Sequence, residues 1–264
     1  MKDFLAVACE AARKAGGILK ENIHGTREIT YKGDINLVTE MDTRSERAVV
    51  ETLRASFPDH GIIAEEETTI RNGSGYTWII DPLDGTTNYA HGYPCFSVSI
   101  ALEHEGVVIT GVVYDPMRDE LFTAQKGEGA YLNGKRIKVS IVDELIKSLL
   151  ATGFPYDRKV SEKNNMDYFH DLLMASQEVR RDGSAALDLC YVAMGRFDGF
   201  WELKLKPWDV AAGSLIVLEA GGRVTDLRDN AFDIFGDEVL ASNGIIHGQM
   251  AEILKRTAEK RKGR

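Results

Sequence analysis

WIIDPLDGTTNYAHG, residues 78–92, is the stretch on which the interpretation of the whole chain depends. It begins as an apolar strand and ends in two carboxylates, Asp81 and Asp84. In α/β proteins, functional groups collect at the carboxyl ends of such buried strands. Pro82 has no N–H group, so we expect the strand to leave its hydrogen-bonding ladder there. The Leu83 carbonyl would then point into a site instead of into a sheet.

The two aspartates and the residues after them are typical of a cation-binding site next to an anion-binding site. Asp81 and Asp84 are three positions apart across a turn that a glycine permits, and hard carboxylate oxygens favour Mg²⁺ or Mn²⁺ over zinc. The N–H groups of residues 85–87 would open a short helix, whose first turn favours phosphate. An ordinary polar turn is the alternative for an isolated D-x-x-D-G. A calcium loop is excluded, because the positions that need Gly and Glu hold Thr86 and Gly92.

The composition is that of an ordinary soluble globular protein with enough length for a sizeable core. The 264 residues are 44% hydrophobic and 28% charged, and the formal net charge is −9. This acidity disfavours direct binding to nucleic acid or to acidic membranes. Three scattered cysteines predict neither a disulfide framework nor a zinc site and favour the reducing cytoplasm. The N-terminal pattern predicts an amphipathic helix and not a signal peptide, and no apolar run approaches the ~20 residues that span a bilayer.

The length allows one large domain or two modest ones, and the pattern along the chain indicates two α+β halves at about 1–145 and 146–264. Helical spacing indicates a first helix over about 3–22 and a second that ends near Phe57. Strand-like alternation from Phe96 to Val139 indicates an antiparallel group of strands with a hairpin at Asn133-Gly134. In the second half, helices are expected over 164–177 and 185–194, after Pro207, and from His247 onward, with short strands between them.

Other acids stand at element ends, where an ordinary structural role competes with metal binding. Glu65 is the first acid after a short apolar strand, the same placement as Asp81, although three adjacent glutamates usually form a solvated run. Asp42, with Thr39 as the alternative, is expected to cap the second helix. Asp209, at the mouth of an apolar helix, is also an N-cap on position alone.

Polar groups in the second half suit an anion or a hydroxyl group. Gly183-Ser184 opens a helix whose first turn is a potential anion site, and Arg180 and Arg181 precede it, with a surface arginine pair as the alternative. Lys204 and Lys206 follow a predicted strand that ends at Glu202. Alternate spacing would put the two lysines on one face, and solvent is the more common location for such a face.

Taken together, AEEET, WIIDPLDGTTN, GSAALDL and PWDVAAGSLIVLEAGG resemble the inositol monophosphatase family of metal-dependent sugar phosphatases, in order and over essentially the whole chain. The combination of D-P-L-D-G-T-T with W-D-V-A-A-G is the most specific part, and RRDGSAALDL with LKPWD is most similar to the bacterial branch. The resemblance implies a single α/β domain over residues 1–264, a layered αβαβα sandwich of the type shared with fructose-1,6-bisphosphatases. It also implies a phosphoric monoester hydrolase that requires Mg²⁺, for which Mn²⁺ can substitute.

The resemblance implies the metal ligands at matching positions. Glu65, Asp81 and the Leu83 carbonyl would bind one metal ion. Asp81, Asp84 and Asp209 would bind a second, with Asp81 bridging, and a weaker third ion would depend on Glu65. Elementary electrostatics supports this set, since four acids in one pocket would repel strongly without cations.

The resemblance likewise implies the catalytic and substrate-binding groups. Asp42 and Thr86 match the family's water-activating pair, and Glu65 and Asp84 complete the catalytic set. We expect in-line attack of water on phosphorus without a covalent intermediate, with Asp84 helping to protonate the leaving oxygen. The expected substrate contacts are Glu65, Leu83, Asp84, Gly85, Thr86, Arg180, Gly183, Ser184, Ala185, Glu202 and Asp209.

The substrate implied by the resemblance is inositol 1-phosphate, with fructose 1,6-bisphosphate, alone or in addition, as the alternative. Lys204 and Lys206 could reach a second phosphate if they point inward. A nucleotide 3′-phosphatase is a weaker alternative. A different class of function is a protein partner of the transcription machinery, as for some bacterial relatives. The resemblance also implies a homodimer and inhibition by lithium.

Overall fold

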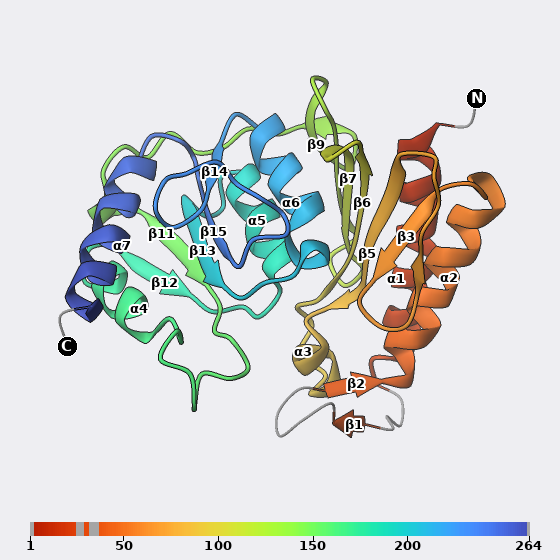
Figure 1. The fold of residues 1–264 in the computed structure, drawn as a ribbon, viewed down its shortest axis with the longest axis horizontal. Helices are drawn as coiled ribbons and strands as arrows, with labels where there is room; N and C mark the ends of the chain where they lie inside the picture. The colour runs from red at the N-terminus through yellow and green to blue at the C-terminus, as the bar shows by residue number, and fades with distance from the viewer. Residues whose placement is uncertain (1–2, 25–28, 32–36, 263–264) are drawn as a thin grey trace.

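The computed structural model describes residues 3–24, 29–31 and 37–262 and arranges them in five layers (Figure 1). Helices form the two outer layers and the middle layer, and a β-sheet lies between each pair of helical layers. The helices are, from the N-terminal side of the molecule, α1 (Phe4–Asn22) with α2 (Glu40–Ser56), then α5 (Ala185–Ala193) with α6 (Pro207–Glu219), then α4 (Met166–Leu173) with α7 (His247–Lys262). The predicted αβαβα arrangement is therefore confirmed.

The first sheet has eight strands in the order β10-β9-β8-β7-β6-β5-β3-β4. These strands are β3 (Gly61–Ala64), β4 (Thr69–Ile70), β5 (Tyr76–Asp84), β6 (Ser97–His104), β7 (Val107–Asp115), β8 (Glu120–Gln125), β9 (Gly129–Leu132) and β10 (Lys135–Arg136). Only β3 and β5 pair in parallel, and the predicted antiparallel group is the meander from β6 to β10. Asn133 and Gly134, with φ of 48° and 76°, form the predicted hairpin turn.

The second sheet has five strands in the order β12-β11-β13-β15-β14. They are β11 (Leu149–Thr152), β12 (Glu178–Arg180), β13 (Gly199–Leu203), β14 (Arg223–Thr225) and β15 (Glu238–Ser242), and a short 3₁₀ helix (Leu145–Lys147) precedes β11. β11 is parallel to both β12 and β13, whereas the other pairs are antiparallel. The remaining elements are the short pair β1 (Ile29–Tyr31) and β2 (Leu37–Thr39) and the helix α3 (Thr86–Ala90). No helix among the described residues has the length and apolar character needed to span a membrane.

Apolar side chains fill the space between successive layers. α1 places a stripe of small, fully buried residues against the first sheet, which lets the helix lie close to the strands: Ala8, Ala11, Ala12 and Ala15. The middle layer is more apolar, and every residue of α5 is buried. Such a helix is expected between two sheets, because neither of its faces meets solvent. α4 and α7 cover the outer face of the second sheet around Trp201 and Leu240.

The middle helices approach the first sheet closely enough to require a glycine. α6 crosses β7 at Gly111, where an added Cβ atom would lie 2.8 Å from the Ala212 carbonyl oxygen. Because α6 begins with Pro207 and carries Asp209 in its first turn, this close approach also fixes the distance of Asp209 from the first sheet.

Candidate functional site

Parallel pairing of β3 with β5 brings two predicted acids to one edge of the first sheet. Ala64 pairs with Ile80, and the Glu65 N–H group donates to the Ile80 carbonyl at 3.1 Å. Glu65 and Asp81 are the residues that follow these two positions, so they lie next to each other on adjacent strands, Glu65 just after the end of β3. Asp81 is 1% exposed, and its Oδ1 atom accepts the Leu83 N–H at 2.9 Å.

β5 does not end at Asp81, as the sequence suggested, but continues through a bulge to Asp84. Asp81 pairs with Ser99 and Asp84 with Ser97, so β5 uses one more residue than β6 over this stretch. The missing N–H of Pro82 accounts for the interruption, and pairing resumes two residues later. A bulge turns successive side chains away from strict alternation, which explains how Asp81 and Asp84 can both serve one site.

Asp84 connects the first sheet to the middle helical layer. Its Oδ2 atom accepts hydrogen bonds from the Ser184 hydroxyl at 2.6 Å and from the Ala186 N–H at 2.8 Å. The start of α5 is therefore occupied by a carboxylate of the protein itself. Burial raises the pKa of Asp84 to about 6, although these hydrogen bonds lower it.

Asp209 occupies the third position of α6, and Lys206 is the N-cap residue. The Oδ2 atom of Asp209 accepts the Lys206 N–H at 2.6 Å. Asp209 therefore supports the start of α6 from its first turn, but it is not the N-cap that its position alone suggested. Its carboxyl group also lies within hydrogen-bonding reach of Asp81. Burial, followed by the charge of Asp84, raises the pKa of Asp209 to about 8. Two carboxyl groups this close share either a proton or a cation.

Thr86 and Asp42 form the predicted pair. The Thr86 Oγ1 atom lies 3.2 Å from the Asp42 Oδ1 atom and 3.2 Å from the Leu83 carbonyl oxygen, and its one proton can serve either acceptor. Asp42 is 1% exposed and lies inside the first turn of α2, which begins at Glu40. Asp42 is therefore not the N-cap of that helix. The side chain of Thr39, the alternative cap, falls outside the described residues.

A cavity of about 800 Å³ lies between the two halves of the molecule, and most of the predicted site residues line it. They are Glu65, Asp81, Leu83, Asp84, Gly85, Thr86, Gly183, Ser184, Ala185, Glu202 and Asp209. Asp42 touches this group through Thr86 and does not line the cavity. The elements that meet here start or end at the same side of the molecule as α3, in the lower part of Figure 1.

Arg180 is the predicted residue that the structure does not bring to the cavity. It is the last residue of the edge strand β12, its side chain is 47% exposed, and its guanidinium lies 3.8 Å from the Glu178 carboxylate. The next residue, Arg181, lines the cavity instead. An Arg-Arg pair in sequence does not indicate which member points inward, because that depends on where the strand ends.

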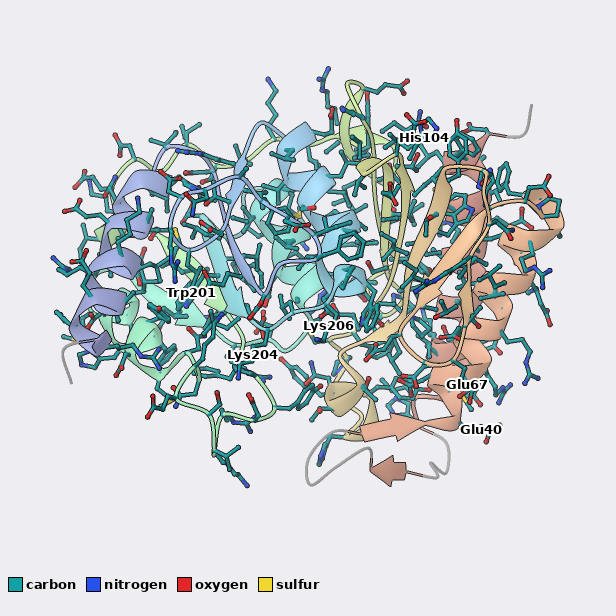
Figure 2. All side chains as sticks on the ribbon, in the orientation of Figure 1. Glu40, Glu67, His104, Trp201, Lys204 and Lys206 are labelled. Atoms are coloured by element: carbon teal, nitrogen blue, oxygen red, sulfur yellow. The ribbon has the colours of Figure 1, made fainter. Side chains whose placement is uncertain are left out.

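Lys204 and Lys206 both line the cavity, but not for the reason that strand alternation suggested. β13 ends at Leu203, and Lys204 has a φ of 62°, so the two lysines are not on one face of a strand. Figure 2 shows both on the segment between β13 and α6. Lys204 is already paired with Asp157, at 2.6 Å, whereas Lys206 has no ion pair with another described residue.

Glu202 and Asp188 are two further buried acids of the cavity wall. Gly153 makes room for Glu202, because a Cβ atom there would lie 2.1 Å from the Glu202 Oε1 atom. Burial raises the pKa of Glu202 to about 8. Asp188 was not predicted, because no local pattern marks it. It is 1% exposed, its Oδ1 atom has no hydrogen-bond partner among the described residues, and burial raises its pKa well above its usual range.

Sequence reasoning also missed the residue that organises the three adjacent glutamates. The Glu46 carboxylate in α2 accepts the N–H groups of Glu66, Glu67 and Thr68, at 2.9, 3.1 and 2.9 Å. Figure 2 shows Glu67 at the edge of the molecule on the α2 side. The turn held by Glu46 thus separates Glu65, which lines the cavity, from its surface neighbours. The signal for Glu46 that the sequence contains is a glutamate on the buried face of an amphipathic helix.

The donor set fits a hard divalent cation. In the described part of the chain, no three His, Cys, Asp or Glu side chains form a group that could hold a metal ion as it stands. Asp81, Asp84 and Asp209 each use one oxygen for a hydrogen bond within the protein. Burial and the charges of Glu65, Asp84 and Asp209 raise the pKa of Asp81 well above its usual range. Carboxylate oxygens of this kind match Mg²⁺ or Mn²⁺, and a cation would relieve the mutual repulsion of these groups.

A model of the inositol monophosphatase family matches residues 1–261 of this sequence. The chain belongs to the inositol monophosphatase family. Members of this family are generally metal-dependent, as the acidic cavity would require. The family model covers both sheets and all the residues of the cavity.

Individual relatives cover almost the whole chain. The Nus factor SuhB of Haemophilus influenzae is 47% identical over 257 residues, 96% of each chain. Inositol monophosphatase 2 of Solanum lycopersicum is 44% identical over 251 residues, 92% of this chain and 94% of that protein. The solved structure of inositol monophosphatase from Anabaena superposes with a TM-score of 0.88 at 47% identity, over 96% of this chain and 95% of that one. This family thus includes proteins named for a phosphatase activity and proteins named as Nus factors.

Proposed function

We propose that this protein is a Mg²⁺-dependent phosphomonoesterase that hydrolyses inositol 1-phosphate to inositol and phosphate. The observation that carries the proposal is the convergence of four carboxyl groups in one cavity. Glu65 follows β3, Asp81 and Asp84 lie on β5, and Asp209 lies at the start of α6. A stabilising role for four such acids is implausible, because burying them together costs free energy unless a cation binds.

Mg²⁺, or Mn²⁺ in its place, would be held by Glu65, Asp81 and the Leu83 carbonyl, and by Asp81, Asp84 and Asp209. The bound cations would supply Lewis-acid stabilisation of the phosphoryl charge and a hydroxide at neutral pH. A third, weaker ion on Glu65 and inhibition by lithium belong to the same proposal.

The residues of the chain would position the water and its proton. The Thr86 Oγ1 atom lies 3.2 Å from the Asp42 Oδ1 atom, so the Thr86 proton would pass to Asp42 as the Thr86 oxygen takes the proton of the attacking water. The N–H groups of Gly85 and Thr86 would hold the phosphate, since Gly85 starts α3 with a φ of 101°. Asp84, ionised when it binds a cation, would help to protonate the leaving oxygen by orienting a water molecule that gives up its proton.

The polyol would lie against the second half of the molecule. Glu202 and the turn from Gly183 to Ala185 face the cavity there and can bind hydroxyl groups. Arg181 takes the place that the sequence assigned to Arg180, because Arg181 lines the cavity. Its positive charge lowers the pKa of Glu202, which places the two side chains close enough to act on one ligand.

Fructose 1,6-bisphosphate is a second candidate substrate, favoured by the basic residues of the same cavity. Arg158, Arg181 and Lys206 line the wall, and none of them has an ion pair with another described residue. A second phosphate would find a partner among these charges. The ratio of the two turnover rates decides between the candidates.

A role as a protein partner of the transcription machinery is the candidate from a different class. It is supported by the 44–47% identity to proteins named Nus factor SuhB. Partner capture that survives Asp81→Asn would separate this role from catalysis, since Asp81 is buried and cannot contact a partner directly. A homodimer in the cytoplasm is part of the same family-based proposal.

The test of the proposed function is phosphate release from myo-inositol 1-phosphate and from fructose 1,6-bisphosphate, side by side. With Mg²⁺ we expect turnover of inositol 1-phosphate, and with EDTA a fall of at least about 100-fold, because the cations stabilise the transition state by several kcal/mol. Adding Mg²⁺ back is the control for irreversible damage. No release from either substrate, or release that EDTA leaves unchanged, would contradict the proposal.

A further inference from the structure

The segment 153–165, between β11 and α4, is a strap at the mouth of the cavity. Its base is closed by Asn165, which is fully buried and has a φ of 74°. The Asn165 side-chain amide donates to the Thr152 hydroxyl at 2.9 Å, and its oxygen accepts the Trp201 Nε1–H at 2.8 Å. The first and last residues of the strap are therefore fixed to each other and to β13.

A single lysine fixes the tip of the strap. The Lys204 Nζ atom donates to the Asp157 Oδ2 atom at 2.6 Å and to the Ser161 hydroxyl at 2.8 Å. Lys204 has a positive φ, which a non-glycine residue keeps only where its surroundings require it. Figure 2 shows Lys204 and Trp201 on the same part of the molecule, at the strap's attachment to the second half. The positive charge of Lys204 is thus used within the protein and is not available to a second phosphate.

Tyr156 is an exposed aromatic residue of the strap that lines the cavity. The opposite wall of the same cavity carries Thr87 of α3 and the acids Glu65, Asp84 and Asp209. Burial, followed by the charges of these three acids, raises the pKa of Tyr156 to about 12. The ring therefore shares the cavity with the carboxylates, while the residue as a whole remains 53% exposed.

Exposure alone does not set Tyr156 apart. Val160 lies on the same strap, is 88% exposed, and does not line the cavity. Tyr156 differs because it lines the cavity that holds the acids, so its exposed aromatic ring borders the space in which a substrate would bind. A tyrosine ring offers a large apolar surface with few rotatable bonds, and the C–H face of a cyclic polyol is complementary to it.

We propose that Tyr156 is a specificity-determining residue whose ring packs against a cyclic polyol, and that Lys204 is the positioning residue that holds the strap for it. This inference rests on the proposed phosphomonoesterase function and deepens it, since it names ring-shaped polyol phosphates as the preferred substrates over acyclic ones. The anchoring of both ends of the strap means that the ring is in place before the substrate arrives.

The test compares myo-inositol 1-phosphate with glycerol 2-phosphate, which carries hydroxyl groups but no ring. For Tyr156→Ala we expect the ratio of the two kcat/KM values to fall about tenfold, mainly through KM for the cyclic substrate, as expected for a lost aromatic contact. Tyr156→Phe keeps the ring and should retain most of the preference. Val160→Ala is the matched control on the same strap and should leave the ratio as in the wild type.

The positioning role of Lys204 has its own readout. Lys204→Met should lower the substrate ratio at least about threefold, and the double variant with Tyr156→Ala should have the ratio of Tyr156→Ala alone, because both changes act through one ring. Lys159→Met, an exposed lysine of the same strap that does not line the cavity, is the matched control. Effects that multiply in the double variant would overturn the positioning role.

The two possible failures give different results. A wild-type enzyme that hydrolyses neither substrate contradicts the proposed function and removes the basis of this inference. A wild-type enzyme that hydrolyses inositol 1-phosphate, with a substrate ratio that Tyr156→Ala leaves unchanged, overturns the role of Tyr156 alone.

Discussion

Asp81→Asn is expected to lower the turnover of inositol 1-phosphate by at least about 10³-fold at saturating Mg²⁺, in line with the loss of a group that stabilises the transition state directly. Asp81 is 1% exposed, and Glu65, Asp84 and Asp209 all act on its charge. It is thus the acid that every other member of the cluster faces. The amide has the same shape but cannot carry the bridging negative charge.

The same substitution is expected to preserve or increase the stability of the metal-free protein. Burial raises the pKa of Asp81 above its usual value of 3.8. At pH values between 3.8 and the raised pKa, the folded state therefore binds more protons than the unfolded state. The folded state therefore loses stability as pH rises from about 4 through the raised pKa, and asparagine removes this loss. Low activity combined with an unchanged or higher melting temperature in EDTA at pH 8 identifies a functional acid.

Asp59→Asn is the control for this experiment, because Asp59 lies exposed in the turn after α2, away from the cavity. It should change neither turnover nor melting temperature. Near-normal turnover of Asp81→Asn at saturating Mg²⁺ would show that Asp81 does not bridge two metal ions. A large loss of stability in EDTA would instead mean that Asp81 holds the fold together.

Gly111→Ala is expected to destabilise the protein by about 1–3 kcal/mol, the usual cost of overpacking a rigid core. The new Cβ atom would lie 2.8 Å from the carbonyl oxygen and 3.2 Å from the Cα atom of Ala212. Both contacts are with the backbone of α6, which cannot move aside as a flexible side chain could. The expected displacement of α6 from β7 also moves Asp209 away from the first sheet, so turnover should fall as well.

Gly17→Ala is the matched control, with the same chemical change in α1. Apart from the backbone of α1 itself and the two neighbouring residues, no heavy atom of the described residues lies within 4 Å of its added Cβ atom, and alanine is favoured over glycine inside a helix. This variant should gain about 0.5–1 kcal/mol. Urea unfolding in EDTA measures the free energy of unfolding of both variants without a contribution from bound metal. If Gly111→Ala is as stable as Gly17→Ala, α6 does not pack against the first sheet as closely as described here.

Sequence patterns over short stretches predicted the part of the site that lies on the adjacent strands β3 and β5. Apolar runs placed β3 and β5, and the rule that functional groups follow buried strands pointed to Glu65 and Asp81. These residues meet because their strands pair in parallel. The five layers followed from the family resemblance together with the order of helices and strands. The division of the chain near residue 145 stays a prediction, although each sheet is built from strands on one side of it.

The rest of the site depends on contacts between distant segments, which no local pattern encodes. Asp209 reaches Asp81 only because α6 packs on β7 at Gly111, and that glycine looked like any other strand residue. Arg181 was not distinguishable from Arg180 without the end of β12. Tyr156 was overlooked, although it follows a buried strand in the same way as Glu65 does. Its importance comes from the cavity that it lines, whose opposite wall belongs to α3 and the first sheet.

Anomalous diffraction from crystals soaked in Mn²⁺ shows whether the acidic cluster in the cavity is a metal centre. We expect two anomalous peaks in the cavity, one next to Glu65, Asp81 and the Leu83 carbonyl, the other between Asp81, Asp84 and Asp209, and neither peak in Asp81→Asn. A cavity without peaks at saturating Mn²⁺ would mean that the cluster is not a metal centre. Peaks found only beside acids outside the cavity, such as Asp226 and Asp237, would lead to the same conclusion.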